Sequence, residues 1–171
     1  KLIELNKKFN FIKKNSNLLD IGSTPGGWSQ VASKIITNGK ILAVDITPME
    51  KLDNVLFLNN DFSDEKVQDK ILKNFSDKID VIVSDMAENT TGNKTVDSIR
   101  TNSLCADVIN FSLKALTKNG SLVCKLFMGV DFLEVKSLAK KNFKNVEFFK
   151  PESSRSESKE TYIFCSRLKT L

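Results

Sequence analysis

Residues 17–30 read NLLDIGSTPGGWSQ, and this stretch decides the fold. A short apolar run at 18–21 breaks into a glycine-rich turn at 22–27, and a helical pattern follows. A buried strand that enters a helix through such a turn is typical of the first unit of a nucleotide-binding α/β domain. Glycine adopts positive φ angles easily, and it lets a ligand approach the backbone without meeting a Cβ atom. The stretch therefore predicts a ligand site at the first strand–helix turn.

Strand and helix patterns alternate along the rest of the chain. Further strands are expected at 40–45, 55–61, 79–85, 121–127, 146–149 and 161–165. Helices are expected at 1–14, 26–37, 63–75, 96–116 and 132–141. Ser63 is the expected N-cap of the third helix, and Asn119-Gly120 is the expected turn before the fifth strand.

This order is typical of an α/β fold with a mostly parallel sheet and helices on both faces. No helix pattern separates the last two strands, so they are expected to be antiparallel neighbours. No repeat, low-complexity tract or linker interrupts the chain, and residues 1–171 are therefore expected to form a single domain.

Composition limits the possible functions. Hydrophobic residues make up 40% and charged residues 27% of the chain, as in ordinary soluble globular proteins. No apolar run approaches the roughly 20 residues that span a bilayer, so no membrane partner is expected. The chain has no histidine, which excludes Ser-His-Asp and Cys-His catalysis and removes the commonest transition-metal ligand. We therefore expect no metal site, and any general base must be another residue type.

The three cysteines are widely spaced in apolar surroundings, which indicates buried thiols in a reducing intracellular compartment. The cytoplasm, the mitochondrion and other organelles remain open, and the nucleolus is less favoured. The chain starts at Lys1 within a helical pattern, so an upstream segment such as a targeting peptide is compatible with it.

Positive charge is concentrated at the two ends of the chain. The net charge of +5 divides into +4 for residues 1–14, −4 for 15–135 and +5 for 136–171. If both ends reach one face of the fold, they would form a basic surface suited to a polyanion such as nucleic acid. The alternative is a solvated lysine-rich surface without a partner.

Three aspartates close consecutive expected strands: Asp45, Asp61 and Asp85. The carboxyl ends of parallel strands bind the ligand in open α/β sheets, so these side chains should line the same edge as the glycine turn. Asp45 lies 19 residues after Gly26, where an acid can hold ribose hydroxyls, and Asp61 is placed further along for an adenine. Taken singly, each aspartate could instead be a turn or cap residue.

The glycine spacing differs from the G-x-G-x-x-G pattern that seats a pyrophosphate on a helix N-terminus. The acidic edge suits a cationic ligand, and S-adenosylmethionine carries a sulfonium, an ammonium group and an adenosine. The two features together favour S-adenosylmethionine over a nicotinamide cofactor, which leaves an oxidoreductase as the disfavoured alternative.

The motifs resemble those of the FtsJ/RrmJ family of ribose 2′-O-methyltransferases along nearly the whole chain. The resemblance rests on LDIGSTPGGWSQ, VDITPM, NNDF, SDMAENTTG, VCKLFMG and KPESSRSESKETYIF. It implies a Rossmann-like methyltransferase fold with a seven-stranded sheet and one antiparallel strand near the C-terminus. Ser23-Thr24 and Glu88 depart from the family pattern, which commonly has Ala-Ala and Pro there, and Glu88 adds a charge near the active edge.

The resemblance also implies the site residues. A Lys-Asp-Lys-Glu tetrad would comprise Lys1, Asp85, Lys125 and Glu160. S-adenosylmethionine would be bound by Gly22, Gly26, Gly27, Trp28, Asp45, Asp61 and Asp85. Lys125, in the apolar strand SLVCKLF, would be the general base that takes the proton of a ribose 2′-hydroxyl, and it must be neutral to do so.

The segments DMAEN and ETYI are more similar to the branch of the family that methylates large-subunit ribosomal RNA, at a uridine of the A-loop. The implied partner is this RNA or the assembled large subunit, bound by a monomer. Transfer RNA or an mRNA cap is the alternative substrate, and a catalytically inactive RNA-binding module is the alternative class. Phosphate contacts are expected from Ser153, Ser154, Arg155 and the lysines at 136, 140, 141, 144, 150 and 159.

Overall fold

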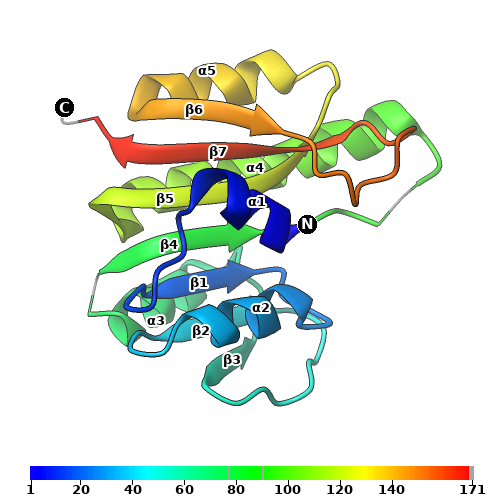
Figure 1. Cartoon of the computed structure of the whole chain (residues 1–171). Coiled ribbons are helices and arrows are strands. Elements are labelled where there is room, and N and C mark those ends of the chain that lie inside the picture. Colours follow the sequence, from blue (N-terminus) through cyan, green and yellow to red (C-terminus); the bar gives the residue numbers. More distant parts are fainter. Residues whose placement is uncertain (77, 90, 170–171) are drawn as a thin grey trace.

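The computed structural model describes residues 1–76, 78–89 and 91–169, and Figure 1 shows the strands and helices alternating along them. The elements are α1 (Leu2–Phe9), β1 (Leu18–Ile21), α2 (Gly27–Ile35), β2 (Ile41–Asp45), β3 (Val55–Asn59), α3 (Glu65–Asn74), β4 (Ile79–Ser84), α4 (Lys94–Ala115), β5 (Leu116–Phe127), α5 (Phe132–Asn142), β6 (Phe143–Phe149) and β7 (Glu160–Leu168). None of the helices in the described ranges is long and apolar enough to cross a membrane.

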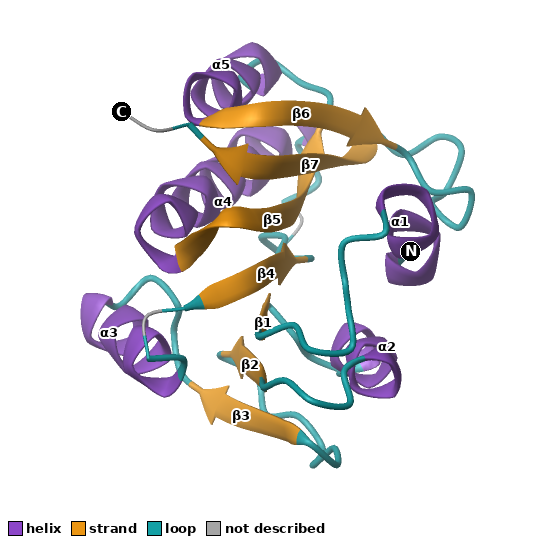
Figure 2. Ribbon diagram, turned by 60° about the vertical axis from the view of Figure 1, so that its left-hand side comes forward, coloured by secondary structure: helices purple, strands orange, loops and turns teal. Residues whose placement is uncertain are grey.

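The strands form one sheet in the order β3-β2-β1-β4-β5-β7-β6. β7 runs antiparallel to both of its neighbours, and the other paired strands are parallel. Helices α1 and α2 cover one face, while α3, α4 and α5 cover the other (Figure 2). The expected α/β fold is confirmed, including the single antiparallel strand near the C-terminus.

Two apolar clusters fill the space between the sheet and the helices. β1 is buried along its whole length, because Leu19 and Ile21 pack toward α3 and α4 while Leu18 packs toward α1 and α2. Full burial of one such side chain contributes roughly 1.5–3 kcal/mol. The apolar run before the glycine turn is therefore the centre of the sheet, and it fixes the turn at the carboxyl edge.

The first helix is shorter than the predicted helix over residues 1–14. α1 ends at Phe9, because Asn10 adopts a left-handed conformation with φ of 50°. The side chain of Asn6 then accepts hydrogen bonds from the backbone N–H groups of Phe11 and Ile12. Ile12 is buried all the same, but on an extended segment that leads into β1.

Two local predictions are also wrong. Asp64, rather than Ser63, is the N-cap of α3 and accepts from the N–H of Lys66, because the Ser63 hydroxyl is bonded to Asp61. The expected turn at residues 119–120 lies inside β5, where the register with β4 shifts between Leu116 and Ser121. A bulge within a strand places turn-forming residues where the sequence pattern indicates a break.

Candidate active site

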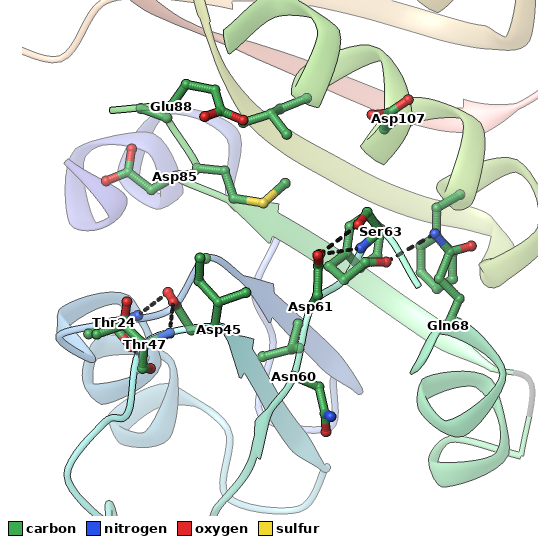
Figure 3. Close-up of a pocket in the computed structure, with 18 of the residues that line it drawn as sticks. Thr24, Asp45, Thr47, Asn60, Asp61, Ser63, Gln68, Asp85, Glu88 and Asp107 are labelled. Carbon is green, nitrogen blue, oxygen red and sulfur yellow. Dashed lines mark hydrogen bonds between the residues drawn. The ribbon is translucent and has the colours of Figure 1, made fainter. Parts of the chain in front are cut away.

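A cavity of about 930 Å³ opens at the carboxyl ends of β1, β2 and β4. The chain connections diverge here, since β1 leads to β2 on one side and β4 lies on the other. Such a switch point is where open α/β sheets bind their ligands. Four of the predicted cofactor residues line the cavity: Gly22, Asp45, Asp61 and Asp85. Figure 3 shows the three aspartates around it. Glu88 lines it as well, so the substitution of an acid at this position adds negative charge to the cavity wall.

Gly22 brings the backbone to the cavity wall. Its φ is +73°, and a Cβ atom at this position would collide with the side chain of Met86. Its N–H donates to the carbonyl of Val44 at 2.9 Å, which ties the turn to β2. Any side chain here would require a strained backbone and would displace Met86, which also lines the cavity.

Asp45 holds the glycine turn and the end of β2 together. Its Oδ2 accepts from the N–H of Thr24 at 2.9 Å, and its Oδ1 accepts from the N–H of Thr47 at 2.8 Å. Each oxygen of a carboxylate can accept a further hydrogen bond. Asp45 therefore combines a structural role with an acceptor that faces the cavity.

Asp61 is fixed in the same manner two residues beyond β3. Its Oδ1 accepts from both the N–H and the hydroxyl of Ser63, at 2.8 and 2.7 Å. Since both bonds use Oδ1, Oδ2 keeps its accepting capacity for a donor in the cavity.

The other three predicted cofactor residues lie outside the cavity lining. Gly26 is the N-cap of α2 with φ of 113°, and Gly27 begins the helix. Trp28 packs against Tyr162 with ring centroids 5.6 Å apart, on the α1 and α2 face of the sheet. In this structure Gly26 and Gly27 start α2, and Trp28 packs against Tyr162.

Asp20 is a buried acid that the sequence pattern presents only as an interruption of the first strand. It is 1% exposed, and its Oδ2 accepts from the Ser29 hydroxyl at 2.7 Å. Its Oδ1 is buried with no hydrogen-bond partner. Burial raises the pKa of Asp20 to about 7, with small additions from the charges of Asp85 and Asp45, against the lowering effect of the Ser29 bond.

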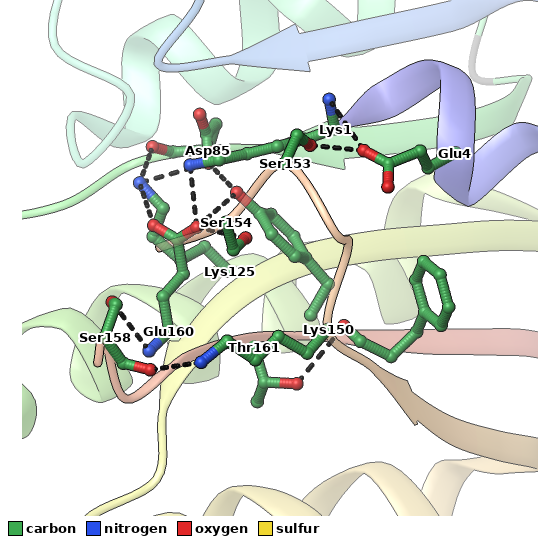
Figure 4. Close-up of polar contacts among 12 residues, drawn as sticks. Lys1, Glu4, Asp85, Lys125, Lys150, Ser153, Ser154, Ser158, Glu160 and Thr161 are labelled. Carbon is green, nitrogen blue, oxygen red and sulfur yellow. Dashed lines mark hydrogen bonds and ion pairs between the residues drawn. The ribbon is translucent and has the colours of Figure 1, made fainter. Parts of the chain in front are cut away.

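The four predicted tetrad residues, Lys1, Asp85, Lys125 and Glu160, come together at the edge of the α1 and α2 face (Figure 4). The Nζ atom of Lys125 lies 3.0 Å from Oδ1 of Asp85 and 3.7 Å from Oε2 of Glu160. It also donates to the backbone carbonyl of Asp85 at 3.0 Å. Nζ of Lys1 lies 2.7 Å from Oε1 of Glu160. Lys125 is only 9% exposed, so its amine is held among acceptors with little access to water.

The pKa of Glu160 lies below its ordinary value. Burial alone raises it, but the hydrogen bond from Lys1 and the charges of Lys125 and Lys1 outweigh burial, aided by a hydrogen bond from Ser154. Glu160 is therefore a carboxylate between two amines.

Tyr162 completes this cluster, although the sequence reasoning did not single it out. Its hydroxyl donates to Oδ1 of Asp85 at 2.6 Å and lies 3.4 Å from Oε1 of Glu160. Burial and the charge of Asp85 raise the pKa of Tyr162 far above its ordinary range. One signal was available, because residues two apart on a strand share a face and Tyr162 follows Glu160 by two.

The two basic ends of the chain adjoin, as the charge pattern suggested. Phe9 of α1 stacks on Phe164 of β7 with ring centroids 4.2 Å apart, and it meets Phe149 edge-on at 6.1 Å. Nζ of Lys8 lies 5.5 Å from the Phe149 ring. α1 is thereby fixed beside β7 and the loop that precedes it.

In that loop, residues 150–159, two hydroxyls bind carboxylates. Ser154 is buried and donates to Oε1 of Glu160 at 3.0 Å, and the exposed Ser153 donates to Glu4 of α1. Phosphate contacts from Arg155 and the lysines stay a prediction. Over the described part of the chain, no group of three or more His, Cys, Asp or Glu residues is placed to hold a metal ion.

Solved structures share this fold. A structure from Plasmodium falciparum, described as a ribosomal RNA methyltransferase, matches with a TM-score of 0.87 and 31% identity, covering 98% of this chain and 94% of that one. Human methyltransferase-like protein 13, solved with SAH, matches with a TM-score of 0.69 at 15% identity, covering 96% and 82%, and it supports the fold alone. This fold and the acidic cavity agree with the family match of the sequence, which defines a methyltransferase that uses S-adenosylmethionine.

Sequence relatives give the family. The ribosomal RNA large subunit methyltransferase E of Pelagibacter ubique (strain HTCC1062) is 44% identical over 169 residues, covering 99% of this chain and 83% of that protein. The protein of the same name from Rickettsia akari (strain Hartford) is 43% identical, covering 95% and 74%. Residues 1–168 match the FtsJ-like methyltransferases, and the chain belongs to that family. The resemblance found in the sequence motifs is confirmed.

Proposed function

We propose that this protein transfers a methyl group from S-adenosylmethionine to a ribose 2′-hydroxyl of large-subunit ribosomal RNA, with a uridine of the A-loop as the expected target. The names of its sequence relatives support the substrate. The reaction type is supported by the position of Lys125, a buried amine bonded to Asp85. Asp85 also borders the cofactor cavity.

The residues of the cavity suit S-adenosylmethionine. Asp45 would accept from the ribose hydroxyls, and Oδ2 of Asp61 would accept from the adenine amino group. The acidic lining suits a cofactor with a sulfonium and an ammonium group, and it would repel a pyrophosphate. When bound, the cofactor supplies an electrophilic methyl group.

Lys125 is the general base of this proposal. Lys125 is paired with two carboxylates and must first release its own proton to solvent. The neutral amine then accepts the proton of the 2′-hydroxyl as the oxygen attacks, and the resulting ammonium is stabilised by Asp85 and Glu160. The Asp85 carboxylate and carbonyl both bind Nζ, so the amine has little freedom to rotate away. Such fixed placement contributes much of the acceleration in a displacement reaction that already has a good leaving group.

The RNA would approach over the adjoining basic ends of the chain. Lys8 belongs to α1, and Lys150 and Arg155 belong to the loop that follows β6. Figure 4 shows Lys150 in the same group of polar residues as the tetrad. Contacts to phosphates position the RNA without reading its sequence, whereas the target nucleotide would be recognised by its shape and its exposed base.

The experiment is a methylation assay with labelled S-adenosylmethionine on three substrates in parallel: assembled large subunits, naked large-subunit rRNA and bulk tRNA. The modified ribose is then mapped. We expect label in large-subunit rRNA at a single A-loop uridine. Label in tRNA would make tRNA the substrate, and RNA binding without transfer in a single turnover would indicate an inactive RNA-binding module.

A further inference from the structure

Glu4 joins α1 to the loop at residues 150–159. Its Oε1 accepts from the backbone N–H of Glu152 at 2.7 Å, and its Oε2 accepts from the hydroxyl of Ser153. The hydrogen bond from Ser153 lowers the pKa of Glu4, against a weaker raising effect of burial. One carboxylate on the first turn of a helix therefore binds two consecutive residues of a loop almost 150 positions away.

These contacts close a ring that passes through the tetrad. Ser153 is followed by Ser154, whose hydroxyl donates to Glu160. Glu160 binds Nζ of Lys1, and Lys1 lies one helical turn before Glu4. The Lys1–Glu160 pair and the Glu4–Ser153 contact are thus two links between the same two segments of the chain.

We propose that Glu4 is a positioning residue for the tetrad, which holds the loop against α1 so that Lys1 and Ser154 reach Glu160. Its effect on turnover rests on the proposed function, whereas its effect on the geometry of Glu160 does not. Without the Glu4 contact, Lys1 would be joined to Glu160 only through a flexible side chain, and the loop would lose the bonds at Glu152 and Ser153 that fix the residue before Ser154.

The aromatic contacts of Phe9 hold α1 itself beside β7, so the physical case for Glu4 concerns the loop, which has few other contacts to α1. The loop is exposed at most of its positions apart from Pro151 and Ser154, so little apolar packing holds it. Lys150 donates to the carbonyls of Ser156 and Ser158, but these bonds stabilise the loop internally and do not reach α1. Among the described residues, Glu4 is the acid of α1 that bonds to this loop.

Titration of Glu160 in the full-length protein tests this geometry without any activity assay. Glu160 faces Lys1 from α1, Lys125 from β5, Tyr162 from β7 and Ser154 from its own loop, with Asp85 on the far side of Lys125. Glu4→Ala removes both acceptors of the loop donors, whereas a glutamine could keep both contacts by donating its NH₂ to the Ser153 hydroxyl. Loss of a nearby negative charge would by itself lower the pKa of Glu160, whereas loss of Lys1 and Ser154 from Glu160 would raise it.

We expect carboxyl-detected NMR to show a higher Glu160 pKa in Glu4→Ala than in the native protein. The control is Glu157→Ala, which removes the same charge from an exposed loop side chain that accepts from its neighbour Ser156. Ser153→Ala removes the contact from the loop side with no change in charge, and it should shift the Glu160 pKa in the same direction. A lower or unchanged Glu160 pKa in Glu4→Ala would overturn the proposal.

Turnover provides the second readout. We expect kcat of Glu4→Ala to fall about tenfold while S-adenosylmethionine affinity and KM for RNA stay within about twofold, since misplacement of catalytic groups acts mainly on the chemical step. Glu157→Ala should keep native kcat. If the native protein methylates none of the RNAs tested but the Glu160 pKa still rises in Glu4→Ala, the proposed function fails and the positioning role stands. An unchanged kcat in Glu4→Ala would remove the catalytic consequence.

Discussion

Asp85 belongs to both halves of the site: its side chain borders the cofactor cavity, and its Oδ1 lies 3.0 Å from Nζ of Lys125. The residue follows directly after β4, at the switch point of the sheet. A group bound in the cavity and a group placed at Lys125 are therefore separated by a single side chain. In the proposed function, this relationship would set the methyl donor beside the base, and variants of the two sites should have separate effects on binding and on transfer.

Replacing Lys125 with alanine should abolish methyl transfer but leave the cofactor cavity intact. Loss of a general base costs typically 10²- to 10⁴-fold, and we expect a fall of about 10³-fold or more in the single-turnover rate. Calorimetry should give native affinity for S-adenosylmethionine, because Lys125 does not line the cavity. Lys66→Ala, an exposed lysine on α3, is the matched control. Full turnover by Lys125→Ala would exclude Lys125 as the base.

Asp45→Asn should weaken cofactor binding. The amide can accept from only one of the two N–H groups that Asp45 now binds, at Thr24 and Thr47, and its NH₂ would face the other. Hydrogen bonds to charged groups contribute about 1.5–3 kcal/mol, so we expect the Kd for S-adenosylmethionine to rise roughly 10- to 100-fold by calorimetry. Asp53→Asn, on an exposed loop, should bind normally. Native affinity in Asp45→Asn would mean that Asp45 is not a cofactor ligand.

Asp20 should make stability fall as the pH rises. Burial raises the pKa of Asp20 to about 7 in the folded state, against about 3.9 in the unfolded chain. Between about pH 4 and about pH 7, the folded protein therefore binds one more proton at Asp20 than the unfolded chain does. The free energy of unfolding falls as the pH rises through this range. Asp20→Asn, which resembles the protonated acid, lacks this dependence.

Urea unfolding of the native protein and Asp20→Asn at about pH 5 and about pH 8 measures the effect. The native free energy of unfolding, taken relative to the variant, should be about 2–3 kcal/mol lower at the higher pH. Other titrating groups are shared by the two proteins and largely cancel in the difference. If the free energies of unfolding of the native protein and Asp20→Asn differ by the same amount at both pH values, Asp20 is not protonated in the folded protein.

RNA binding should weaken steeply with salt, since phosphate contacts release counterions. Arg155 is exposed on the loop beside the tetrad, and Arg155→Ala should reduce the slope of log K against log salt by about 1. Lys118→Ala, an exposed lysine in the amino-terminal part of β5 at the opposite edge of the sheet, should leave the slope unchanged. Filter binding over a range of salt concentrations gives the slope for each variant. Equal slopes for Arg155→Ala and the native protein would mean that the RNA does not bind at Arg155.

Local pattern was a good guide wherever neighbouring residues decide the structure. The strand at residues 18–21, the glycine turn and the acids at strand ends all lie where the sequence indicates. It failed where a side chain competes for the backbone: Asn6 and Asn10 end α1 early, and Ser63 is bonded to Asp61 and so does not cap α3. Hydrophobic spacing does not register such hydrogen bonds.

The sequence by itself determined the order of strands and helices, the cofactor turn and, through its motifs, the family. The tertiary structure decided which polar groups meet. Lys1, Asp85, Lys125 and Glu160 are brought together because β4, β5 and β7 are neighbours in the sheet and α1 packs beside β7. Glu4, Ser154 and Tyr162 join them through the same long-range pairing. Periodicity specifies which face of an element is buried, but strand order and helix placement depend on packing of the whole core, and these contacts follow from them.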